Sequence, residues 1–146
     1  MKCVDASIGV KWVIAEEYSA QAAELVVETS SAGNVLIAPP LMPSEVTNTV
    51  RQRMRREGLS LVEGDLLLAH FLAYPVTLVA PNALYRLALN IAETYNLQAA
   101  YDAEYVALAQ LFGCELWTDD RKLIKAVGHR LTFVKWIGNY PVGQSA

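Results

Sequence analysis

Apolar residues fall into short continuous runs that alternate with longer stretches in which they recur every three or four positions. Short apolar runs bounded by Gly, Pro or Asp are typical of buried strands, and the three-to-four spacing is typical of helices. The pattern predicts strands at residues 2–4, 35–38, 76–79, 115–118 and 131–134. It predicts helices at about residues 7–15, 19–33, 43–57, 60–72, 83–96, 100–112 and 120–127.

Residues that start and stop helices support several of these boundaries. We expect Ser7 and Ser19 to cap helices, because a serine side chain accepts a hydrogen bond from a free N–H of the first turn. Ser60 is expected to start a further helix. Gly33 and Gly58 stand where helices are expected to stop. Strands and helices that alternate in this way predict βαβ units, and therefore a mostly parallel sheet covered on both faces.

Length and composition restrict the class of protein. With 146 residues the chain is expected to form a single domain, residues 1–146. A hydrophobic content of 53% and a charged content of 18% exclude a disordered protein. The net charge of −3 provides no overall positive field, so any nucleic-acid binding must use a local patch.

The sequence predicts a soluble protein of a reducing compartment, the cytoplasm. Its two cysteines, Cys3 and Cys114, are too few for a disulfide framework or a cysteine-rich metal site. The N-terminal residues lack the apolar stretch of a signal peptide. The stretch 66–85 has no charged residue, but Pro75 and Pro81 interrupt it, so it is not expected to span a membrane.

Acidic residues stand where the predicted strands end. Asp5 follows the first strand, Glu45 lies in the first turn of the helix after the second, and Asp102 lies near a helix start. The pair Asp119 and Asp120 follows the fourth strand. Sites in open parallel sheets lie beyond the carboxyl ends of the strands, so these acids are expected at one edge. Carboxylates without nearby His or Cys suit Mg²⁺ or Mn²⁺, which points to metal-assisted phosphodiester hydrolysis.

Each acid also has a purely structural interpretation. An Asp or Glu at a helix N-terminus commonly acts as a cap or interacts with the helix dipole. Taken singly, Glu45 and Asp102 fit that interpretation, and Asp119-Asp120 fits a turn. Asp5 fits it less well, because an acid directly after a buried strand is expected to gain little structurally.

The acids and their surroundings resemble the PIN-domain ribonucleases, most closely the VapC-type toxins of toxin–antitoxin pairs. The matching stretches are VDAS at residues 4–7, PSEVTN at 43–48, YDAEYVALA at 101–109 and LWTDDRKL at 116–123. They occur in the family's order and roughly its spacing, and extend over nearly the whole chain. One such stretch would be weak evidence for this family, whereas the four together are specific to it.

The resemblance implies a three-layer α/β/α sandwich with a five-stranded sheet, and an endoribonuclease that uses Mg²⁺ or Mn²⁺. Asp5, Glu45 and Asp102 match the family's three principal metal-binding acids. The family pattern selects Asp120 as the fourth, and Asp119 remains an alternative. The hydroxyl-bearing positions near the family's metal site correspond here to Ser7 and Thr118.

The resemblance also implies partners, namely an RNA substrate, a homodimer and a cognate antitoxin whose C-terminal segment occupies the cleft. The dense basic run in the third helix offers Arg51 and Arg55, spaced i,i+4, as candidates to bind RNA phosphates. A solvated helix face is the structural alternative for these arginines. Asn48 is placed to support Glu45, three residues earlier on the same face.

Two other functions stay open at this point. One is a PIN-domain nuclease that processes RNA without an antitoxin. The other is a phosphoacceptor receiver domain, which shares a parallel α/β fold, acids at strand ends and a lysine near the last strand, here Lys135. Against the receiver, Asp5 is not followed by a second acid, and the middle strand runs into Val79-Ala80-Pro81 without an Asp.

Overall fold

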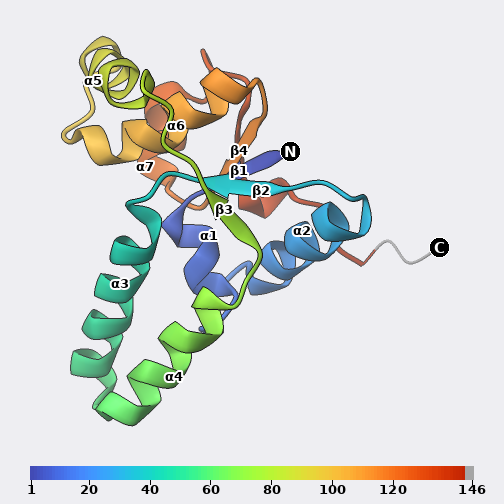
Figure 1. The fold of residues 1–146 in the computed structure, drawn as a ribbon, viewed down its shortest axis with the longest axis vertical. Helices are drawn as coiled ribbons and strands as arrows, with labels where there is room; N and C mark the ends of the chain where they lie inside the picture. The colour runs from blue at the N-terminus through green and yellow to red at the C-terminus, as the bar shows by residue number, and fades with distance from the viewer. Residues whose placement is uncertain (144–146) are drawn as a thin grey trace.

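The computed structural model describes residues 1–143, whose five strands form one parallel sheet in the order β3-β2-β1-β4-β5 (Figure 1). The strands are β1 (Lys2–Val4), β2 (Leu36–Ala38), β3 (Val76–Leu78), β4 (Glu115–Thr118) and β5 (Val134–Trp136). The helices are α1 (Ala6–Lys11), α2 (Ser19–Ser31), α3 (Met42–Glu57), α4 (Leu61–Leu72), α5 (Leu84–Thr94), α6 (Ala100–Phe112) and α7 (Arg121–Val127). A short 3₁₀ helix, η1 (Ile137–Asn139), follows β5.

The helices cover both faces of the sheet, and the expected α/β/α sandwich is confirmed. Parallel strands are joined by right-handed crossovers, so connections that run toward β3 lie on one face and those that run toward β5 lie on the other. Figure 1 shows α1 to α4 on one side of the strands and α5 and α6 on the other, with α7 against β5. The single-domain prediction covers residues 1–146, of which 144–146 lie outside the described residues.

The register of the central strands places β1 beside β4, and β4 beside β5, although β1 and β4 are far apart in the sequence. Val4 lies opposite Trp117, and Thr118 lies opposite Trp136. The residue after Val4 is Asp5, which therefore leaves the sheet beside Thr118. Because all five strands are parallel, their carboxyl ends share the edge at which the sequence places its acids.

Most helix boundaries agree with the sequence to within two residues, and two expected caps are wrong. Ser19 is the first residue of α2, whose N-cap is Tyr18, and the Ser19 hydroxyl accepts instead from the Glu16 N–H at 3.0 Å. The helix expected to start at Ser60 is α4, of which Ser60 is the N-cap: its hydroxyl accepts from the Glu63 N–H at 3.1 Å, while the Glu63 carboxylate accepts from the Ser60 N–H at 2.9 Å. The expectation that Ser7 caps the first helix is wrong. Asp5 is the N-cap of α1 and accepts from the Ile8 N–H at 3.4 Å, so this acid has a structural role as well.

The fifth strand begins three residues later than predicted. The apolar run 131–134 favoured a strand there, but the Leu131 N–H donates to the Val127 carbonyl at 2.7 Å, and the Val134 N–H donates to the Leu131 carbonyl at 3.1 Å. The first of these residues therefore form a turn that closes α7. Pairing with β4 then continues to Trp136, which carries that indole to the acidic edge of the sheet.

No helix in residues 1–143 combines the length and the apolar character needed to cross a membrane. Cys3 is buried in β1 and Cys114 is half-buried before β4, and both are free thiols. Burial raises the pKa of the Cys3 thiol well above its ordinary value, so it acts as a small apolar core residue.

Gly9 allows α1 to pack closely against α3 and α4. A Cβ atom at Gly9 would lie 2.8 Å from Met42 Cε and 2.8 Å from Phe71 Cε1, both inside van der Waals contact. The six-residue helix that carries Asp5 at its start is thus held by a contact that only glycine permits.

We predict that Gly9→Val lowers the free energy of unfolding by about 1–3 kcal/mol, because the added methyl groups overfill this contact. Ala20→Val, at an exposed position of α2, is the matched control and is expected to cost no more than about 0.7 kcal/mol of helix propensity. Urea unfolding of both variants measures the difference. Equal losses would show that the site around Gly9 adapts freely.

Candidate active site

Asp5 lies at the centre of a set of hydrogen bonds that joins β1, α1 and β4. One carboxylate oxygen, Oδ1, accepts from the Ser7 hydroxyl at 2.5 Å, and the other, Oδ2, accepts from the Thr118 hydroxyl. The same hydroxyl oxygens accept in turn from the N–H groups of Asp119 at 2.8 Å and Asp120 at 2.9 Å. Both hydroxyls named from the sequence therefore orient a carboxylate that is only 6% exposed.

The other predicted acids lie around Asp5 on separate elements, each at a helix start. Glu45 is in the first turn of α3 and accepts from the Tyr105 hydroxyl at 2.5 Å. Asp102 is in the first turn of α6. Asp120 is the N-cap of α7, and its Oδ1 accepts the N–H groups of Lys122 and Leu123 at 3.0 and 3.1 Å.

These carboxylates are close enough to repel one another. Burial, followed by the charge of Asp120, raises the pKa of Asp5 to about 7, although bonds from Ser7 and Thr118 oppose the shift. Burial raises the pKa of Glu45 as well, with a further contribution from the charge of Asp102. Burial also raises the pKa of Asp102, and the charge of Asp120 adds to it. None of the four acids forms an ion pair within residues 1–143.

The side chains fit a hard divalent cation by their chemistry. Oxygen donors from Asp and Glu are the ligands that Mg²⁺ and Mn²⁺ prefer. As placed, no three His, Cys, Asp or Glu side chains of the described residues stand close enough to enclose an ion. The fit to a cation therefore rests on the donor chemistry of Asp5, Glu45, Asp102 and Asp120.

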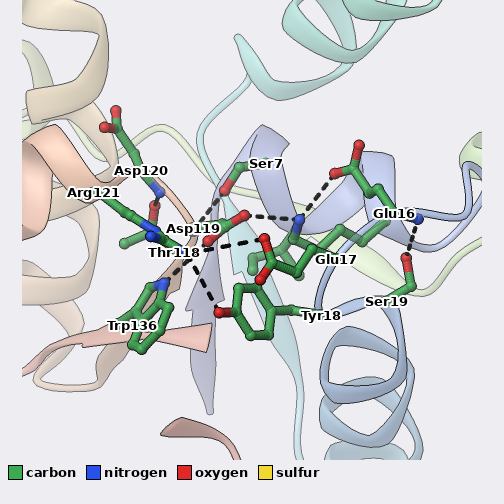
Figure 2. Close-up of polar contacts among 12 residues, drawn as sticks. Ser7, Glu16, Glu17, Tyr18, Ser19, Thr118, Asp119, Asp120, Arg121 and Trp136 are labelled. Carbon is green, nitrogen blue, oxygen red and sulfur yellow. Dashed lines mark hydrogen bonds and ion pairs between the residues drawn. The ribbon is translucent and has the colours of Figure 1, made fainter. Parts of the chain in front are cut away.

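Asp119 and Asp120 are adjacent in sequence, but their carboxylates point in different directions (Figure 2). Asp119 Oδ2 pairs with Lys11 Nζ at 2.8 Å, and Asp119 Oδ1 accepts from Trp136 Nε1 at 3.0 Å. Both oxygens of Asp119 are therefore engaged outside the group of acids. Asp120 is the one whose charge acts on Asp5, Glu45 and Asp102.

Asn48 lies beside Glu45, and the arginines follow further along α3. Asn48 is exposed and lines a surface pocket together with Ser7 and Glu45. Arg51 and Arg55 are exposed, and within residues 1–143 neither forms an ion pair. Arg53 differs from them, because it pairs with Glu16 at 3.3 Å and with Glu57 at 2.8 Å.

Two polar residues at the site were not selected from the sequence. Tyr105 lies three residues after Asp102 on α6, and burial together with the hydrogen bond to Glu45 raises the pKa of its hydroxyl, which stays protonated. Its i,i+3 spacing from Asp102 was a usable signal. Lys11, 5% exposed, pairs with Asp119 and Glu16. A charged residue between apolar neighbours in a short helix was the signal there.

Comparison with known proteins identifies the family. The family model described as PIN domain matches residues 3–132. The chain belongs to the PIN domain family. This assignment sets aside the receiver-domain alternative.

Individual relatives agree with it. The chain is similar to Ribonuclease VapC12 of Mycobacterium tuberculosis, in strains CDC 1551 / Oshkosh and ATCC 25618 / H37Rv alike, with 31% identity over 97 residues, 66% of this chain and 73% of the relative. The crystal structure of PAE2754 from Pyrobaculum aerophilum superimposes with a TM-score of 0.68 at 20% identity, covering 94% of this chain and 90% of the other. The second likeness concerns the fold alone.

We predict that, without metal, the wild-type protein loses stability relative to Asp5→Asn as the pH rises from about 4 to about 7. A carboxyl whose pKa is raised by folding contributes stability below its unfolded pKa, and this contribution is lost as pH passes through the folded value. The difference is expected to reach a few kcal/mol, since one pKa unit corresponds to about 1.4 kcal/mol. Urea unfolding in chelator at several pH values measures it, and parallel curves would contradict the burial of an ionised Asp5.

Proposed function

We propose that this chain is a metal-dependent endoribonuclease that acts as the toxin of a toxin–antitoxin pair. The observation that carries the proposal is the group of four carboxylates, Asp5, Glu45, Asp102 and Asp120, at one sheet edge of a PIN-family chain. Among the described residues no cationic side chain pairs with these acids to offset their mutual repulsion. A divalent cation would offset it. The name of the similar mycobacterial protein, a ribonuclease, supports RNA as the substrate.

In this proposal Asp5 and Asp102 hold Mg²⁺ or Mn²⁺, and Glu45 and Asp120 complete or support its coordination. When bound, the cation would activate water and neutralise charge on the scissile phosphate. Ser7 and Thr118 keep the carboxylate of Asp5 in one orientation through their hydroxyl hydrogen bonds. Tyr105 does the same for Glu45.

The arginines of α3 are proposed to hold the RNA. Arg51 and Arg55 are exposed and have no carboxylate partner within residues 1–143, so their guanidinium groups are available to phosphates. They lie on the same helix as Glu45, further from its N-terminus. RNA held along α3 would therefore lead toward the acids, past Asn48.

We propose that the chain acts in the cytoplasm and has two protein partners, a second copy of the chain and an antitoxin. Exposed apolar side chains support these protein partners. On α4 the exposed fractions of Leu61, Val62 and Leu66 are 77%, 70% and 64%, and α5 exposes Leu89. Apolar surface of this extent is typical of protein interfaces. A PIN nuclease that processes RNA without an antitoxin remains the alternative. Growth arrest on expression of the wild type, absent with Asp102→Asn, would favour the toxin.

We predict that the purified protein cuts RNA only when Mg²⁺ or Mn²⁺ is present, and that Asp102→Asn slows cleavage by roughly 10²-fold or more. Total RNA, including tRNA and rRNA, is incubated with metal or with chelator and resolved on a denaturing gel. Glu93→Gln, which removes an exposed carboxylate from α5, is the matched control and should cut like the wild type. Cleavage that survives both chelator and Asp102→Asn would contradict the proposal.

We predict that Asp120→Asn weakens Mn²⁺ binding at least tenfold, whereas Asp119→Asn changes it by no more than about threefold. The reason is that Asp119 already pairs with Lys11, while Asp120 acts on the other acids. Calorimetric titration with Mn²⁺ measures both affinities. The reverse order would make Asp119 the fourth acid.

A further inference from the structure

Lys11 is a buried cation near the acids, and the proposed function assigns it no role. Its side chain is 3% exposed, and its Nζ lies 2.8 Å from Asp119 Oδ2 and 2.9 Å from Glu16 Oε1. Burial alone would lower the pKa of Lys11, but the hydrogen bonds to Asp119 and Glu16 raise it above its ordinary value. The residue is therefore a charged ammonium group with two carboxylate partners.

The position of Lys11 follows from the length of α1. Asp5 caps the start of this six-residue helix and Lys11 is its last residue, where a positive charge is favoured by the helix dipole. The same rigid element thus holds an acid of the proposed metal site at one end. At the other end it holds the cation that contacts the loop after β4.

Of the three consecutive side chains at residues 118–120, only two act on Asp5. Thr118, Asp119 and Asp120 are consecutive, and the first and third face Asp5 through a hydrogen bond and through charge, respectively. The carboxylate of Asp119 contacts Lys11 Nζ through one oxygen and Trp136 Nε1 through the other. Figure 2 shows Asp119 directed toward Trp136 and away from Asp120. A free Asp119 would compete with Asp120 for the same cation and would turn the loop.

We propose that Lys11 is a positioning residue: by pairing with Asp119 it holds that carboxylate away from the proposed metal site, so that Asp120 alone acts from the loop after β4 on the other acids. Trp136 assists from the opposite side, because its indole N–H holds the second oxygen of Asp119. Two further charged groups belong to this network, since Glu16 bridges Lys11 and Arg53. The inference rests on the proposed metal-dependent function.

The sign of the change in metal affinity separates positioning from simple electrostatics. Removal of a positive charge near a cation site strengthens cation binding when only Coulomb forces act. Loss of a positioning contact weakens binding, and groups that orient metal ligands typically matter by 10–100-fold. Lys11→Met is therefore expected to weaken Mn²⁺ binding roughly tenfold. Arg53→Met removes the same charge from the same network without touching Asp119, and is expected to leave binding unchanged or slightly tighter.

A second substitution tests whether Lys11 acts through Asp119. In Lys11→Met the carboxylate of Asp119 is left without its cation, whereas Lys11→Met/Asp119→Asn removes both charges and keeps an oxygen for Trp136. The double variant is expected to bind Mn²⁺ within about threefold of the wild type, because coupled residues show non-additive effects. Trp136→Phe, which changes no charge, is expected to weaken binding about threefold by releasing the other oxygen.

Calorimetric titration of Mn²⁺ into the full-length protein and its variants, with thermal unfolding of each apo form, carries out the test. Absence of Mn²⁺ binding by the wild type would overturn the proposed metal site itself. Wild-type binding that is unchanged or tighter in Lys11→Met would overturn only the role of Lys11. If Lys11→Met does not fold, unchanged binding in Trp136→Phe would overturn it instead. Weaker binding in Lys11→Met, restored in the double variant, establishes the positioning role.

Discussion

The carboxylate of Asp5 joins elements that are more than one hundred residues apart, and the arrangement of the acidic edge depends on it. Its oxygens accept hydroxyl hydrogen bonds from α1 and from the end of β4, and one of them also caps α1. Those hydroxyl oxygens also accept hydrogen bonds from the N–H groups of Asp119 and Asp120, so they fix the backbone there as well. The β1–β4 register, with Val4 opposite Trp117, makes this geometry possible.

The buried acids at this sheet edge accept hydrogen bonds, but among the described residues no cationic side chain offsets their negative charge. Hydroxyls satisfy Asp5 and Glu45 as acceptors, yet burial and mutual repulsion make their ionised forms costly. Nearby, Lys11 and Arg53 form ion pairs with Asp119, Glu16 and Glu57, and neither cation pairs with the four acids of the candidate site. Acids with raised pKa values and no ion pair among the described residues are typical of functional sites, which agrees with the proposed cation site.

The sequence predicted the fold and the location of the acids because both depend on local pattern. Short apolar runs, caps such as Ser60 and stops such as Gly58 act within a few residues of themselves. The choice between Asp119 and Asp120, by contrast, depends on Lys11 and Trp136, which lie far away in the sequence. The start of β5 also differed, because the turn that closes α7 used residues with strand-like composition.

The strand order has a consequence for the chain during its synthesis. β1 is made first, but one of its two neighbours, β4, is made after more than one hundred further residues, and Cys3 then pairs with Leu116. The acids therefore cannot assemble until the chain has been made through β4 and Asp120, since Thr118 and Asp120 follow Asp5 by more than one hundred residues. Pairing of such long range is also slow to form. The acidic edge of an emerging polypeptide is therefore incomplete until β4 enters the sheet.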